Sequence, residues 1–588
     1  MHKEINEYNE TTNMPLQKLP KRRKGSFSRM IAAAVIFLLQ LAFLVWGLYT
    51  LSAFALSVYI VFQIVSAFTV IRIVYNQSNP SYKIAWITMI LVIPFMGIIF
   101  YAMWGRGRYP RKMRKRIPIL SEMTIPLYRW NHDTEMEIAY MHPAQERITK
   151  FLSKSGFPVY RHEASEYYHL GDTFYPAMIA EIKKAKKFIL LEFFIISKGK
   201  MWDELFEVLR QKAEEGVDVR LLYDDFGCMS TLPNRFWAQI SETGIKAAVF
   251  NPVLPFVNNF YINYRNHQKI CVVDGNVGFT GGVNIADEYI NVVDAFGHWK
   301  DSGLKLTGES VWSLTVMFLQ MWAYAVSGTA KRDQRRIYAG KIEDYNKFLP
   351  EAPRESGPAA AQAQGQSQQA RQEQENEQAQ APDRGRQAQA QQEQERSRQE
   401  QGHRGRGFVQ PFCDGPFNNP NNPAEYLYMQ MINHAKDYIY ITTPYLVLDN
   451  EMVTALSLAA LSGVDVRIIT PGIPDKKYVY LLTRSFYGTL LKAGVRIFEY
   501  TPGFIHSKNV VSDDETAVVG TVNMDFRSFY LHFENGVWLC GTDTVLDIKA
   551  DFLNTLTKCQ EVDYLKWKKR PWYIRTTQAI LNIFAPML

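Results

Sequence analysis

Residues 265–287 read RNHQKICVVDGNVGFTGGVNIAD, and residues 504–523 repeat the pattern as FIHSKNVVSDDETAVVGTVN. Each copy has a His, a Lys two positions later and an Asp five positions after the Lys, followed by a glycine-containing turn and an Asn. One copy can arise by chance, whereas two copies at matching places indicate a function. The shared residues are His267, Lys269, Asp274 and Asn284 in the first copy and His506, Lys508, Asp513 and Asn523 in the second.

The segments around these motifs repeat as well, and they determine the expected fold. The pentapeptide GVDVR begins at Gly216 and again at Gly463, between a helix-period segment and a short strand-like segment. Both halves alternate such helices and β-branched strands in the same order, which is typical of βαβ units. We therefore expect an α/β protein with two repeated domains, each a mainly parallel sheet flanked by helices.

Long uncharged runs near the N-terminus predict a membrane region. Residues 30–71 and 84–104 contain no Asp, Glu, Lys or Arg, and about 20 apolar residues suffice to cross a bilayer. The first run is long enough for two helices and the second for one, with a kink at Pro94. Basic clusters at both ends favour an even number of crossings, so three helices would require one re-entrant or interfacial segment. A multi-pass protein of the cell membrane with cytoplasmic catalytic domains is expected.

Composition supports this organisation. The net charge is +8, and its basic clusters flank the apolar runs, which favours anionic lipids over nucleic acid as partners. The five cysteines are scattered singly, which predicts reduced thiols in the cytosol.

The segment between the two halves has a different composition. Residues 351–407 contain no Val, Leu, Ile, Met, Phe, Tyr or Trp, so a disordered insertion is expected, with a solvated helix as the alternative. The expected parts are a basic cytoplasmic tail (1–29), a transmembrane region of two or three helices (30–105), a basic connector (106–145), a first domain (146–350), the insertion (351–407), a second domain (408–560) and a C-terminal interfacial helix (561–588).

The motif spacing has a chemical rationale. Residues two apart on a strand project to the same face, so each His lies beside its Lys, and the following turn brings the Asn alongside. If the halves pack face to face, one pocket holds two imidazoles, two ammonium groups and two amides. Such a pocket suits a phosphodiester: one imidazole attacks phosphorus and the other protonates the leaving alcohol. No metal and no cofactor are expected.

Carboxylates downstream of each motif are candidates for orienting the imidazoles. Asp301 in GHWKD and Glu534 in YLHFEN each follow their Asn by about one strand, although both could be ordinary carboxylates at strand ends. We expect the motif residues Asp274 and Asp513 to hold the geometry of the strand and turn through backbone N–H groups. Two further histidines nearby, His298 and His532, are expected to be structural or substrate-lining.

The paired H-x-K-x4-D motifs resemble the phospholipase D superfamily. The segments NPSYKIAW and FYAMWGR, the second motif region and the C-terminal KWKKRPWYIRTTQAILNIFAPML resemble bacterial cardiolipin synthases. The resemblance covers nearly everything from about residue 60 onward except the insertion at 351–407.

This resemblance implies that two phosphatidylglycerols become cardiolipin and glycerol. It implies that His267 is the nucleophile and that His506 acts first as acid and then as base. It also implies that Lys269, Lys508, Asn284 and Asn523 hold the phosphoryl oxygens. Two alternatives remain: a phosphodiester hydrolase acting on lipid or, less well, on nucleic acid, and a catalytically silent membrane scaffold. The C-terminal segment is expected to be an interfacial helix, with a packed terminal helix as the alternative.

Overall fold

The structure is a computed structural model that describes most of the chain. The described residues are 35, 38–43, 45–46, 53–76, 79–105, 111–253, 263–329, 345, 347–349, 407–417 and 422–587. The expected tail at 1–29 and almost all of the expected insertion at 351–407 lie outside them. Contacts divide the chain into two units, Met1–Phe68 and Thr69–Leu588.

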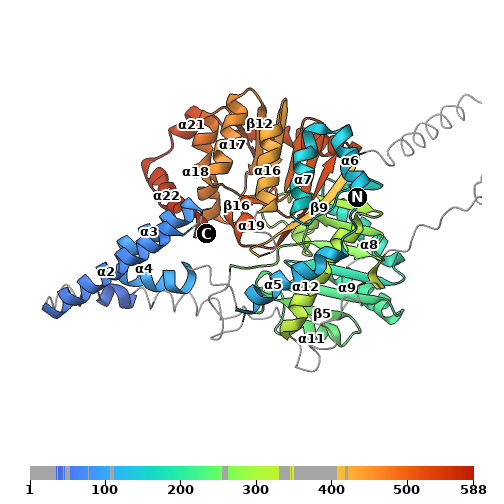
Figure 1. Cartoon of the computed structure of the whole chain (residues 1–588), viewed down its shortest axis with the longest axis horizontal. Coiled ribbons are helices and arrows are strands. Elements are labelled where there is room, and N and C mark those ends of the chain that lie inside the picture. Colours follow the sequence, from blue (N-terminus) through green and yellow to red (C-terminus); the bar gives the residue numbers. More distant parts are fainter. Residues whose placement is uncertain are drawn as a thin grey trace, which may run out of the picture. The chain divides into compact units, whose positions relative to one another are not determined.

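The first repeat forms a seven-stranded sheet (Figure 1). Its parallel pairs, β3 with β4 and β4 with β5, are joined through helices, which include α9 (Lys200–Glu214). The other neighbouring strands are antiparallel. The order is β2 (Ala164–Tyr168), β8 (Gly303–Thr307), β7 (Val277–Gly281), β6 (Ile270–Val273), β3 (Phe188–Phe193), β4 (Asp218–Asp224) and β5 (Lys246–Phe250).

The second repeat forms a nine-stranded sheet with the same central pattern. Its parallel pairs are β10 with β12 and β12 with β13, and α17 (Asn450–Leu461) and α18 (Lys477–Lys492) join them. Its edge strand β1 precedes the first sheet in the sequence and pairs with β9. The order is β1 (Tyr160–Arg161), β9 (Phe408–Asp414), β17 (Glu534–Cys540), β15 (Thr516–Gly520), β14 (Asn509–Ser512), β10 (Tyr438–Thr442), β12 (Asp465–Pro471), β13 (Arg496–Tyr500) and β18 (Cys559–Glu561).

The two-repeat α/β fold is confirmed, but the expectation of mainly parallel strands is wrong. The stretch after each His-x-Lys folds back on itself as an antiparallel hairpin, β6–β7 or β14–β15. The reversal in the first hairpin is a tight turn in which Asp274 and Gly275 have φ of 51° and 75°. A turn this short can join only antiparallel strands, whereas parallel strands need a longer crossover.

The repeated glycine of GVDVR ends a helix in both halves. Gly216 follows α9 with φ of 90°, and Gly463 follows α17 with φ of 97°. This left-handed backbone is the usual helix C-terminus, and glycine adopts it without a Cβ penalty. The repeated pentapeptide therefore marks the step from helix to parallel strand in each half.

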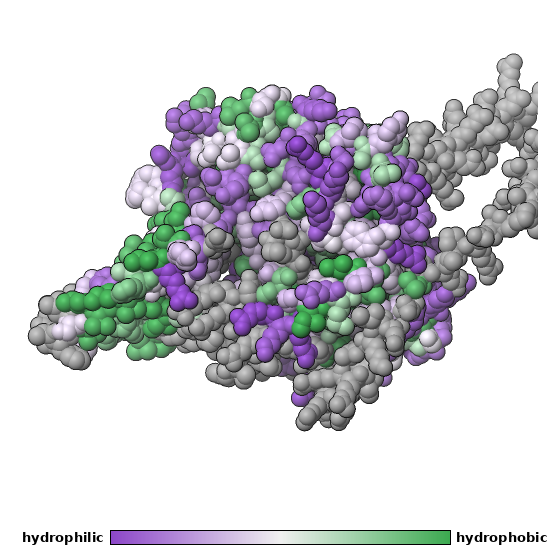
Figure 2. All heavy atoms as spheres, in the orientation of Figure 1, coloured by the Kyte–Doolittle hydropathy of each residue, from purple (hydrophilic) through white to green (hydrophobic). Residues whose placement is uncertain are grey.

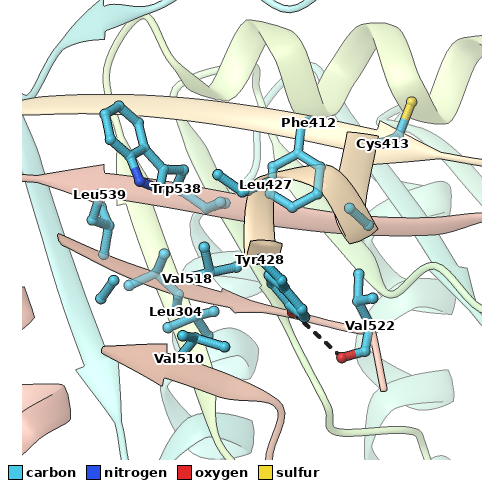
Figure 3. Packing of buried hydrophobic residues seen from close by; sticks show 14 of the residues in the cluster. Leu304, Phe412, Cys413, Leu427, Tyr428, Val510, Val518, Val522, Trp538 and Leu539 are labelled. Carbon is cyan, nitrogen blue, oxygen red and sulfur yellow. Dashed lines mark hydrogen bonds between the residues drawn. The ribbon is translucent and has the colours of Figure 1, made fainter. Parts of the chain in front are cut away.

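The two sheets share one hydrophobic core. Leu304 of β8 belongs to the same buried cluster as Val510, Val518 and Trp538 of the second sheet (Figure 3). The helix α12 (Val311–Thr329), between the two repeats, adds Trp312 to this cluster. Because the cluster crosses from one repeat to the other, the two motif hairpins are held in a fixed mutual position.

One described helix is long and apolar enough to cross a membrane, Ser57–Tyr75 within α2 (Ala53–Tyr75). The second apolar run was expected to form one kinked helix, and it forms two: α3 (Pro80–Val92) ends before α4 (Pro94–Phe100) begins. Pro94 causes this break because it lacks an N–H group for the preceding turn. Figure 2 shows hydrophobic surface on α2 and α3.

The start of α3 is attached to the second repeat. Asn79 caps the helix by accepting from Ser81 N at 2.9 Å. Its Nδ2 donates to Asp449 Oδ2 at 3.2 Å and to Tyr530 OH at 3.1 Å. Tyr530 ends α19 (Phe526–Tyr530), the short helix that follows the second motif, so a chain of hydrogen bonds joins α3 to the motif region.

The C-terminal helix α22 (Trp572–Ile583) has a packed face and an exposed end. It packs on α18, and Gln578 Nε2 donates to Leu481 O at 3.1 Å. Trp572 and Tyr573 at its start are exposed. The helix therefore has the packed face expected of a packed terminal helix and the solvent-facing aromatic residues expected of an interfacial helix.

Candidate active site

Each motif histidine is hydrogen-bonded to a carboxylate of the other half. His267 Nδ1 lies 2.8 Å from Glu534 Oε2, and His506 Nδ1 lies 2.6 Å from Asp301 Oδ2. Both carboxylates are fully buried and both imidazoles nearly so. An ionised carboxylate accepts a hydrogen bond from Nδ1–H, so the Nε2 of each ring is the nitrogen left for substrate.

Backbone pairing between the halves produces this exchange. His267 N donates to Phe533 O at 2.8 Å, and His506 N donates to Lys300 O at 2.7 Å. Phe533 and Lys300 immediately precede the two carboxylates. The structure corrects one expectation here: each His and Lys lies just before β6 or β14, in a segment that forms an isolated bridge with the other half.

Several polar residues that the sequence reasoning missed support these pairs. Thr521 Oγ1 donates to Glu534 Oε2. Asn535 Oδ1 accepts from Lys269 N at 3.2 Å, and Ser302 Oγ donates to Asn509 Oδ1 at 3.1 Å. A signal was present in the sequence, because Ser302 and Asn535 each follow their carboxylate directly and each contacts the motif of the other half.

The two lysines are buried beneath the imidazoles. Lys269 Nζ donates to His267 O at 2.8 Å, and Lys508 Nζ donates to His506 O. Burial lowers the pKa of Lys269 to about 8 and that of Lys508 to about 7, although nearby carboxylates oppose the change. An anion entering the site would raise both pKa values and so favour the charged forms of the two lysines.

The imidazoles are neutral in the free site. Burial lowers the pKa of His267 to about 3, since Glu534 offsets only part of the desolvation, and it lowers that of His506 to about 4. Burial alone would raise the pKa of each carboxyl group, but the histidine and lysine neighbours outweigh it, so Glu534 and Asp301 stay ionised with a lowered pKa.

The charges of the two motifs influence each other. Lys269 lowers the pKa of His506 and of Lys508, which belong to the other half. Such coupling requires that the groups lie close together in a medium of low polarity. Lys269 of the first motif is therefore within electrostatic reach of His506 and Lys508 of the second.

The motif aspartates lie at the opposite ends of their strands from the histidines. Asp274 accepts from Lys186 N, Lys187 N and Phe188 N at 2.7–2.9 Å. Asp513 accepts from the three equivalent N–H groups, those of Lys436, Asp437 and Tyr438. Three such bonds per carboxylate connect the hairpin turn to the start of β3 or β10.

The two asparagines occupy different settings. Asn284 Oδ1 accepts from Ile195 N at 3.0 Å, and its Nδ2 donates to Tyr289 OH at 2.7 Å. The Tyr289 ring in turn packs edge-on against His506, with centroids 5.4 Å apart. Asn523 Oδ1 is buried and has no hydrogen-bond partner among the described residues. Asn284 therefore braces the wall of the site, whereas the side chain of Asn523 retains a free acceptor.

Two groups of side chains in the described part of the chain have metal-ligating atoms within 4.8 Å of one another. His142, Glu515 and Cys540 form one, but His142 and Gln145 already bond to the two oxygens of Glu515. The other group is His267, His532 and Glu534. The ammonium charges of Lys269 and Lys508 act on Glu534, which disfavours a further cation there.

Comparisons with known proteins agree with this fold. A family model described as the PLD-like domain of cardiolipin synthase matches residues 178–295 and 428–556, which contain both motifs. A model described as the phospholipase D-nuclease N-terminal region matches residues 61–106. The two PLD-like domains thus define a protein of the phospholipase D class.

Relatives narrow the assignment. An uncharacterized protein of Streptococcus mutans is 36% identical and covers 88% of this chain and 99% of its own length. A cardiolipin synthase of Geobacillus kaustophilus is 32% identical, with 87% and 90% covered. The chain belongs to the cardiolipin synthase family, and it is an enzyme of this type that acts in phospholipid biosynthesis. Its apolar N-terminal helix fits a membrane-associated protein.

A solved structure shows the same fold. The phosphatidylserine synthase of Haemophilus influenzae superposes with a TM-score of 0.50 at 16% identity. The match covers 75% of this chain and 97% of the other.

Replacing Glu534 by Gln is expected to lower kcat by about a hundredfold to ten-thousandfold. The amide retains the shape but cannot hold the Nδ1–H tautomer or balance charge on His267. Initial rates with lipid substrate measure the effect, and thermal unfolding checks that the variant folds. Glu309→Gln, at an exposed carboxylate outside the site, is the matched control and should retain full activity. Equal activity of both variants would contradict a role for the carboxylate.

The pH profile should report the two lysines. Their pKa values of about 8 and about 7 mean that raising the pH through this range removes positive charge from the free site. We expect kcat/KM to fall on the alkaline side with an apparent pKa between these values, which belongs to the coupled pair. A kcat/KM that stays constant up to about pH 10 would contradict this assignment.

Proposed function

We propose that the enzyme transfers a phosphatidyl group from one phosphatidylglycerol to another, giving cardiolipin and glycerol through a phosphatidyl-histidine intermediate. The observation that carries the proposal is the pair of buried imidazoles, each bound through Nδ1 to a carboxylate of the other half. Two such groups supply the nucleophile and the acid that a double displacement at phosphorus needs.

In the first step, the Nε2 lone pair of His267 attacks phosphorus, and the bond from phosphorus to the glycerol oxygen breaks. His506, protonated once the anionic phosphodiester has entered, gives its Nε2 proton to that oxygen, and glycerol leaves. In the second step, His506 takes a proton from the primary hydroxyl of the incoming phosphatidylglycerol. Its oxygen binds phosphorus, and the P–N bond breaks and returns the electron pair to His267.

The cations and amides then have defined roles. Lys269 and Lys508 each use one N–H on a backbone carbonyl and have two more for phosphoryl oxygens. Charge-assisted bonds of this kind stabilise the extra negative charge of the pentacoordinate transition state. Asn523 supplies its amide to the phosphate, and Asn284 contributes its remaining N–H.

Water is the competing acceptor, and a hydrolase with the same motifs is the alternative function. We propose transfer because α2 and the exposed Trp572 and Tyr573 of α22 suit a site held at a lipid surface, where a second lipid alcohol is locally concentrated. The same features are without use for a nucleic-acid substrate. We place the chain in the cell membrane as a multi-pass protein, with the catalytic domains on the cytoplasmic side and anionic lipids as partners.

A substrate with a good leaving group can separate the roles of the two histidines. Phosphatidyl-4-nitrophenol needs no acid, so His506→Asn should release a burst of about one nitrophenolate per active site and then stop, because no base activates the acceptor. His267→Asn should give no burst. Stopped-flow absorbance measures the burst, and mass spectrometry after alkaline quenching locates the phosphorylated peptide.

Two different outcomes would contradict the proposal. A burst and a modified peptide at residue 506 in His267→Asn would reverse the assigned order of the histidines. Absence of a phosphohistidine in every form of the enzyme would overturn the covalent mechanism itself.

The products identify the acceptor. Purified full-length enzyme with phosphatidylglycerol vesicles should yield cardiolipin and free glycerol in equal amounts. Phosphatidic acid as the main product would establish the hydrolase, and no turnover would favour a scaffold. The double variant His267→Asn/His506→Asn is the blank for contaminating activity.

A further inference from the structure

The two histidine–carboxylate pairs are not equivalent, because only one has a third titratable group. His532 Nδ1 lies 3.6 Å from Glu534 Oε1, while the other oxygen of Glu534 binds His267. The rings of His267 and His532 are 5.6 Å apart between centroids. In the other pair, the second oxygen of Asp301 accepts from Ser302 N at 2.8 Å.

Two buried atoms at this place lack partners. His532 Nδ1 and Glu534 Oε1 are both inaccessible to solvent and make no hydrogen bond within the described residues. A buried polar atom without a partner costs free energy, and these two face each other. In the tautomer with its hydrogen on Nδ1, the His532 ring would satisfy both atoms at once after a small closing movement.

The first repeat has a different residue at the equivalent position. Trp299 stands two residues before Asp301, as His532 stands two residues before Glu534. The Trp299 and His506 ring centroids are 5.5 Å apart, so an indole occupies in one half the place that an imidazole occupies in the other. Phe504 and Tyr289 complete an aromatic surround for His506.

We infer that His532 is a positioning residue that makes the halves unequal: it takes up part of the charge of Glu534 and thereby keeps His267 neutral and nucleophilic. This inference rests on the proposed function and explains its order of steps. A carboxylate that faces two imidazoles stabilises a positive charge on either imidazole less than a carboxylate that faces only one.

The other histidine has the opposite setting. Asp301 serves His506 without a competing imidazole, because its second oxygen accepts from Ser302 N. His506 is therefore the better proton carrier, which suits the acid and base role. The asymmetry comes from one position in each half, 299 and 532.

Among the described residues, His532 acts on the pKa of the Glu534 and Asp525 carboxyl groups and of the His267 imidazole. Burial raises the pKa of Asp525, and His532 lowers the pKa of His267. Removing the imidazole at 532 leaves Glu534 as the main charge facing His267.

The test is His532→Asn, which keeps a polar side chain of similar reach but cannot carry charge. With the full charge of Glu534 acting on it, His267 becomes more basic and protonates at higher pH. The burst rate with phosphatidyl-4-nitrophenol depends on neutral His267 and does not need an acid. In the pH profile of this burst rate, we expect the fall at acidic pH to begin about one pH unit or more higher in His532→Asn than in the wild type. Below that pH the variant should react about tenfold more slowly than the wild type, and above it the two rates should be equal.

The control is His298→Asn, a matched change at a histidine that bonds to Tyr500 OH outside the two pairs. It should leave the fall at acidic pH in place. If His532→Asn lowers the burst uniformly at all pH values, or leaves it unchanged, His532 has only a structural role or none, and the inference is wrong. A wild-type enzyme without any burst would instead overturn the proposed function.

Discussion

The exchange of carboxylates between the two repeats is the constraint on which the site depends. Each imidazole is oriented by a residue from the other half, and each of those residues follows a backbone bond between the halves. A displacement of one repeat against the other would break both pairs together. The shared core around Leu304, Val510 and Trp538 therefore also sets the distance across which the carboxylates reach.

Burial gives this exchange its chemical effect. In water a His–carboxylate contact would be weak and mobile, whereas here both carboxylates are removed from solvent and remain ionised. The cost of burying them is offset by charged hydrogen bonds and by two ammonium groups. The same desolvation keeps the imidazoles neutral in the free site.

The sequence predicted the two-repeat fold because the motif and the GVDVR segments recur in the same order. It also led to Asp301 and Glu534 as candidates, from their position after each Asn. It could not show that they serve opposite halves, since strand pairing between repeats leaves no periodic pattern. The parallel pairing was overestimated for a related reason: hydrophobic strands were visible, but the tight turn at Asp274 and Gly275 determines their direction. His532 was set aside because it lies outside the motif spacing, although its contact with Glu534 depends only on three-dimensional proximity.

The hydrogen bonds from Asn79 to Asp449 and Tyr530 have a geometric consequence. They bind the first turn of α3 to α19, which follows the second motif, so they restrict the orientation of the motif region relative to α3. A movement of α3 is therefore transmitted to the region behind the second motif, and a movement of that region is transmitted to α3.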